Sequence, residues 1–68
     1  MRYAVVFEKS QTGYGAYVPD LPGCVALGET FSDTERLIRE AIEFHLEGLR
    51  YDGVATPEPV AIAQYIDI

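Results

Sequence analysis

The sequence predicts one α+β domain spanning residues 1–68, with strands and helix in the order β-β-β-α-β. Its first thirty or so residues contain short runs rich in Val, Tyr and Phe, separated by Gly and Pro, which is typical of strands joined by turns. One later stretch repeats apolar residues every three to four positions, as an amphipathic helix does. A chain of 68 residues has room for a single domain, in which one helix covers one face of a small sheet.

The first two strands are expected at Arg2–Glu8 and Tyr14–Val18, since both are rich in β-branched and aromatic residues. Ser10–Gly13 supplies the turn between them. A four-residue hairpin loop would place the apolar residues of both strands on one face. The side chains sharing that face would be Val5, Phe7, Ala16 and Val18.

A rigid bend is expected at Pro19–Gly23, because two prolines and a glycine exclude regular ladder pairing. A third strand is expected at Cys24–Thr30, weakened by Gly28. Two roles are open for the bend. It is either a recognition loop that exposes fixed backbone groups or a structural corner between strands.

The helix is predicted to begin at Ser32, which would form a capping box with Glu35 and leave Phe31 just outside. Gly53 is the expected stop. Two ion pairs at i,i+4 spacing would join Glu35 to Arg39 and Arg36 to Glu40. The apolar side consists of Leu37, Ile38, Ala41, Ile42, Leu46 and Leu49, with Phe44 at its edge.

A last strand is expected at Val60–Ile68, after a loop bracketed by Pro57 and Pro59. The helical crossover would make it parallel to the first strand, at the sheet edge beside it. The face not covered by the helix would then be apolar and tyrosine-bearing, which suits a contact surface. Its expected residues are Ala4, Val6, Tyr17, Ala26, Ala61, Ala63 and Tyr65.

The net charge limits the classes of partner that the chain is expected to bind. The formal net charge is −6, so the chain alone should repel nucleic-acid phosphates and anionic membranes and attract a basic protein. No apolar run reaches the length of a membrane span, and the N-terminus lacks signal-peptide anatomy. The single cysteine forms no internal disulfide, which suits a reducing cytoplasm.

Residues that could carry chemistry are few. Cys24 and His45 could form a nucleophile pair, and Glu8, Asp20 and Glu29 could resemble a divalent-metal nuclease site. More commonly, a lone cysteine is a buried apolar residue, a lone histidine bonds a backbone carbonyl, and scattered acids are solvated. One Cys and one His are too few for a metal site. The sequence therefore favours a protein without catalytic residues, metal or cofactor, with a small hydrolase as a minor alternative.

Five tyrosines are many for this length, and tyrosine is enriched in interfaces because it has an apolar body and a polar tip. A partner or oligomer surface is therefore favoured over plain core tyrosines. The expected interface residues are Val6, Tyr17, Asp20, Leu21, Pro22 and Tyr65.

Nearly the whole chain resembles the HicB-like antitoxins. The segment Pro19–Cys24, reading Pro-Asp-Leu-Pro-Gly-Cys, is fairly specific in combination with Gly28-Glu29-Thr30. The other similar segments are Tyr3–Phe7 with the glycine turn after it, Tyr17-Val18, the acidic helix that contains Ala41, Gly53 and Pro57–Pro59. Longer members carry a C-terminal DNA-binding segment, whereas this sequence ends at Ile68, so a short stand-alone member is expected.

This resemblance implies a partial ribonuclease-H-like fold and a cytoplasmic antitoxin that neutralises HicA, a small basic mRNA-cleaving toxin, by direct binding. It also implies homo-oligomers, as dimers or tetramers, and no nuclease activity. The alternative is an oligomeric regulator or scaffold of the same fold with no toxin partner.

Overall fold

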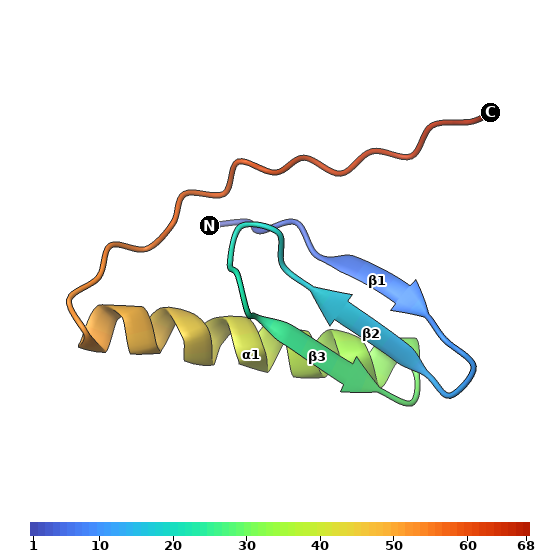
Figure 1. Cartoon of the computed structure of the whole chain (residues 1–68), viewed down its shortest axis with the longest axis horizontal. Helices are drawn as coiled ribbons and strands as arrows, with labels where there is room; N and C mark the ends of the chain where they lie inside the picture. Colours follow the sequence, from blue (N-terminus) through green and yellow to red (C-terminus); the bar gives the residue numbers. More distant parts are fainter.

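The computed structural model describes residues 1–68 as a three-stranded antiparallel sheet with one long helix across one face (Figure 1). The strands are β1 (Val6–Lys9), β2 (Tyr14–Tyr17) and β3 (Val25–Gly28), in spatial order β1-β2-β3. The helix α1 (Phe31–Tyr51) follows β3 directly and packs mainly beneath β3 and β2. The expected α+β class, with an antiparallel meander followed by a helix, is confirmed.

The register of the sheet decides which side chains face α1. Phe7 lies opposite Ala16, which lies opposite Ala26, and this row faces the helix. Val5, Phe7, Ala16 and Val18 all belong to or pack against one core, so their expected shared face is confirmed. The expectation that Ala26 lies on the opposite face is wrong. The bend before β3 determines which residue of β3 lies opposite Ala16. The residues of β3 alone do not predict this register, so they do not predict which face Ala26 occupies.

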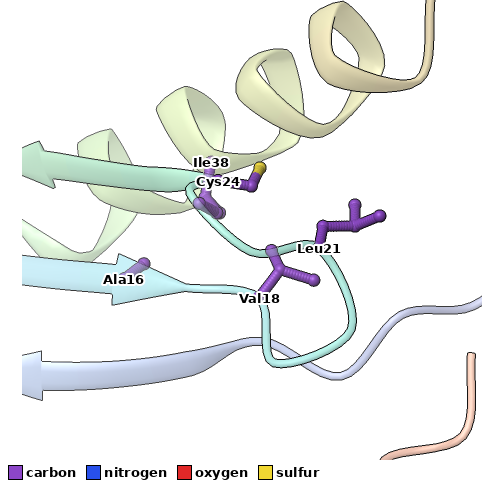
Figure 2. Close-up of a cluster of buried hydrophobic side chains, with 5 residues drawn as sticks. All are labelled: Ala16, Val18, Leu21, Cys24 and Ile38. Carbon is purple, nitrogen blue, oxygen red and sulfur yellow. The ribbon is translucent and has the colours of Figure 1, made fainter. Parts of the chain in front are cut away.

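The core is small and centred on the bend between β2 and β3 (Figure 2). Leu21 is completely buried. Its backbone N–H donates to the Val18 carbonyl and its carbonyl accepts from the Cys24 N–H, both at 3.0 Å. The Pro-rich segment is therefore a structural corner that turns a leucine inward. The buried apolar residues are Ala16, Val18, Leu21, Cys24 and Ile38.

The helix begins earlier than the sequence predicts. Thr30, and not Ser32, is the N-cap, with φ −123° and ψ 162°, and its Oγ1 accepts from the Asp33 N–H at 3.0 Å. Phe31 therefore lies inside the first turn, where its ring centroid is 4.4 Å from that of Phe7. Thr30 and Asp33 have the same Thr/Ser-x-x-acid spacing as Ser32 and Glu35, so the sequence offers two N-caps, and the structure uses the first one.

The helix ends where the sequence predicts. Gly53 adopts φ 72°, its N–H donates to the Arg50 carbonyl, and the Val54 N–H donates to the Leu49 carbonyl at 2.8 Å. This is the Schellman arrangement that a C-terminal glycine favours. Of the two expected ion pairs, Arg36–Glu40 forms at 3.6 Å between exposed side chains, whereas Glu35 and Arg39 form none.

The C-terminal tail, residues 54–68, differs from expectation because Val60–Ile68 forms no strand. Two prolines, Pro57 and Pro59, lie before it and have no N–H to donate to a ladder. The tail runs extended and away from the sheet, so the expected parallel partner of β1 is missing (Figure 1).

Two contacts hold the start of the tail to the body. The Tyr3 hydroxyl donates to the Pro57 carbonyl. The backbone N–H groups of Val60 and Ala61 both donate to Oδ2 of Asp20, at 3.0 Å each. The bend therefore fixes the point at which the tail leaves the domain.

Candidate functional site

The sheet face that points away from α1 carries exposed apolar side chains. Val6, Tyr17 and Val25 form one row across the three strands, because Val6 pairs with Tyr17 and Tyr17 with Val25. Leu27 lies next to this row and is 80% exposed, while Val25 is 63% and Tyr17 41% exposed. We call Val6, Tyr17, Val25 and Leu27 the open sheet face. A contiguous apolar surface of this kind is typical of a protein-binding site.

Gly15 shapes the open sheet face. It pairs with both Glu8 and Leu27, and a Cβ on Gly15 would lie 3.3 Å from Cδ2 of Leu27. The missing side chain therefore lets Leu27 lie across β2. Glu8 ends the same row at the β1 edge, and Glu29 follows β3. An apolar strip beside acidic side chains, on a chain of net charge −6, is complementary to an apolar surface with a basic rim.

The structure brings only two of the expected interface residues together. Val6 and Tyr17 are paired neighbours on the open sheet face. Pro22 is exposed at the tip of the bend, and Tyr65 is 98% exposed in the tail. Leu21 belongs to the core instead, with no exposed surface.

Asp20, the remaining expected interface residue, is half-buried, and one oxygen of its carboxylate is used by the tail amides described above. Its role in this structure is therefore to hold the tail. The tail residues expected on the open sheet face, Ala61, Ala63 and Tyr65, lie outside the sheet because no fourth strand forms.

Sequence reasoning missed Val25 and Leu27. Both were available as large apolar residues that alternate with Ala26, but that alternation fits either face until the register with β2 is known. The sequence offers one partial signal, Gly15, because a glycine within a strand marks a close approach, which here is made by Cδ2 of Leu27.

Cys24 and His45 line the same shallow groove, of about 470 Å³, between β3 and the second half of α1. Asp52 lines it as well. However, no hydrogen bond joins Cys24 to His45, and burial raises the pKa of the Cys24 thiol above its ordinary value. A raised pKa reduces the thiolate fraction, which is the opposite of what a cysteine nucleophile requires. The geometry therefore gives no support to nucleophilic catalysis by Cys24.

The expected carboxylates are not assembled into a metal site. No group of three or more His, Cys, Asp or Glu side chains lies close enough to hold a metal ion, so Glu8, Asp20 and Glu29 stay apart. The helix α1 does not combine the length and the apolar content that crossing a bilayer requires.

Comparison with known proteins places these features in a family. A family model described as "HicB_like antitoxin of bacterial toxin-antitoxin system" matches residues 3–68. A 14.9 kDa protein of Haemophilus phage HP1, from its rep-hol intergenic region, is 42% identical over 98% of this chain. The chain spans only 50% of the length of that phage protein. A UPF0150 protein of Helicobacter pylori is 46% identical over 74% of this chain and 69% of its own length.

The same fold occurs in a solved toxin–antitoxin structure. One chain of a structure described as "HicA3 and HicB3 toxin-antitoxin complex" superposes with a TM-score of 0.74 and 33% sequence identity. The match covers 88% of this chain and 70% of that chain.

Proposed function

Because this chain belongs to the HicB-like antitoxin family, we propose that it neutralises a HicA-type mRNA-cleaving toxin by direct protein–protein binding, with no reaction of its own. The observation that carries the proposal is the match of residues 3–68 to the antitoxin model, together with the likeness to a chain from a toxin–antitoxin complex. Cytoplasmic action fits a chain whose single cysteine is free.

The open sheet face is the surface we assign to the toxin. Tyr17, Val25 and Leu27 are exposed and Val6 is half-buried, and Glu8 and Glu29 flank this face. Burying Val25 and Leu27 against an apolar patch would supply affinity, while the acidic surroundings would steer a basic toxin and fix its orientation.

The test is calorimetric titration of the purified chain with a HicA-type toxin encoded beside it. The double variant Val25→Asp/Leu27→Asp should bind about 100-fold more weakly, because two carboxylates would lose their water at an apolar interface. The matched control is Phe44→Asp/Tyr51→Asp, which places the same charges on exposed apolar positions of α1 and should bind like the parent chain. Equal binding by both variants would remove the open sheet face from the proposal. Failure of the parent chain to bind at micromolar concentration would remove the proposal itself.

A second candidate is an oligomeric regulator that has no toxin partner. The observation that favours it is the large apolar surface that this chain leaves exposed outside the open sheet face. A homo-oligomer in the absence of any neighbouring toxin gene would support this candidate.

A further inference from the structure

The side of the sheet that points away from α1 has a gap at the centre of one row. In that row Glu8 on β1 lies opposite Gly15 on β2, and Gly15 lies opposite Leu27 on β3. The neighbouring row, which contains Tyr17, has a side chain on each of the three strands. Gly15 therefore leaves a gap on the middle strand, with an acidic residue on one side of it and an apolar residue on the other.

The side chain of Leu27 leans into this gap. A Cβ on Gly15 would lie 3.3 Å from Cδ2 of Leu27, so that methyl group lies over β2. Neighbouring strands are about 4.8 Å apart, which separates the backbones of β1 and β3 by about 10 Å. Because Leu27 crosses part of that separation and is still 80% exposed, its apolar surface extends from β3 towards Glu8.

The carboxylate of Glu8 has no partner in this chain. It is exposed and takes part in no ion pair and no side-chain hydrogen bond. The adjacent cation, Lys9, points to the opposite side of the sheet, because side chains alternate along a strand. On a chain of net charge −6, this carboxylate favours a cation supplied by another molecule.

We infer that Glu8 and Leu27, on either side of the gap at Gly15, bind one arginine side chain of the toxin, an inference that rests on the proposed function. The methylene stem of the arginine would lie on Leu27 across β2, and its guanidinium would reach the Glu8 carboxylate. Arginine suits both halves of this site. It packs its stem along apolar surface, and its planar head donates two parallel hydrogen bonds to a carboxylate.

Other side chains suit the site less well. An apolar group would cover Leu27, but it would remove water from Glu8 without replacing the lost hydrogen bonds. Lysine carries the charge on a more strongly hydrated ammonium, which lacks the two-pronged geometry of the guanidinium. Gly15 is a positioning residue, because the missing Cβ lets Leu27 lie close enough to Glu8 for one long side chain to contact both.

The first test is calorimetric titration of the full chain with the toxin. Glu8→Gln keeps the size of the side chain and removes its charge, so it should bind about 10- to 100-fold more weakly. Glu47→Gln removes the same charge from an exposed position on α1 and should bind like the parent chain. A parent chain that does not bind would overturn the proposed function and this inference together. A parent chain that binds no more tightly than Glu8→Gln would overturn the arginine site alone.

The second test identifies the arginine on the toxin. Each toxin arginine is replaced by lysine in turn, and each variant is titrated with the parent chain and with Glu8→Gln. One replacement should weaken binding to the parent chain about 10-fold and change binding to Glu8→Gln little, because the paired carboxylate is already absent there. If no arginine is coupled to Glu8 in this way, or if a toxin lysine is coupled instead, the inference is wrong.

The third test examines the role of Gly15. The Cβ of Gly15→Ala would displace the flexible end of Leu27 and would lie no closer than 3.9 Å to the carbonyl oxygen of Ala26, so the domain should stay folded, as urea denaturation would verify. The substitution should weaken toxin binding about 10-fold in the parent chain and hardly at all in Leu27→Ala, where no leucine remains to be displaced. Equal weakening in both backgrounds would contradict a positioning role for Gly15.

Discussion

Leu21 and Pro22 are neighbours in the bend, yet they have opposite roles. Leu21 has no exposed surface and anchors the core, whereas Pro22 lies at the surface. Composition marked both as recognition residues, because a Pro-rich loop does not reveal which of its side chains turns inward. The structure supplies that direction, since the Leu21 side chain is buried and its backbone is held by hydrogen bonds to Val18 and Cys24.

Leu21→Ala is therefore expected to destabilise the domain by about 2–5 kcal/mol, because it leaves a cavity in a core of only five apolar residues. Pro22→Ala should change the free energy of unfolding by less than about 1 kcal/mol. Urea denaturation followed by circular dichroism measures both. Similar losses for the two variants would mean that Leu21 is not the anchor of the bend.

Cys24 links stability to alkaline pH. Burial raises the pKa of its thiol in the folded state, so the folded chain holds this proton more tightly than the unfolded chain does. The resulting stability is complete below the ordinary thiol pKa and is lost as the pH rises through the raised value. Unfolding measured between neutral and alkaline pH should therefore show a decline that is smaller in Cys24→Ala. An identical decline in both chains would contradict this origin.

At the scale of elements, α1 depends on Thr30 as its N-cap. Thr30→Ala should cost about 1 kcal/mol, because the Asp33 N–H would lose its acceptor. Ser32→Ala is the matched control and should cost clearly less, since Ser32 makes no capping bond in this structure. Thermal unfolding compares the two variants. A larger loss for Ser32→Ala would restore the helix start that the sequence alone predicts.

The elements show how far sequence reasoning reaches. Local sequence patterns predict the meander, the apolar side of α1 and the end of α1 at Gly53. Contacts with the rest of the chain do not change these features. Which face Ala26 and Val25 occupy depends on a register set by the bend. The start of α1 depends on which of two local caps, Thr30 or Ser32, the chain uses, and the pattern alone does not decide between them. The tail has the sequence pattern of a strand but forms no strand in this chain. Strand formation also requires the free edge of a sheet within reach.

The candidate site could be predicted in kind but only partly in detail. The excess of acidic residues and the uncovered apolar face point to a protein partner, and Val6 and Tyr17 lie on that face. Its most exposed members, Val25 and Leu27, required the register, and Asp20 proved to hold the tail.

At the scale of the whole molecule, the charge of −6 should act on the rate of association more than on the lifetime of a complex. If the proposed HicA-type toxin is the partner, stopped-flow mixing with it should show an association rate that falls steeply as salt is raised, while the dissociation rate changes little. An association rate independent of salt would contradict electrostatic steering.

The small core and the large accessible surface indicate that binding a partner would stabilise this chain. Only six residues of 68 are buried, and the open sheet face is apolar.

Inhibition of a toxin's RNA cleavage tests the antitoxin proposal most directly. A HicA-type toxin encoded beside this chain is mixed with RNA and titrated with the purified protein. Cleavage should stop near molar equivalence, and Val25→Asp/Leu27→Asp should inhibit far less effectively than Phe44→Asp/Tyr51→Asp. Undiminished cleavage at a large molar excess of the parent chain would contradict the antitoxin proposal.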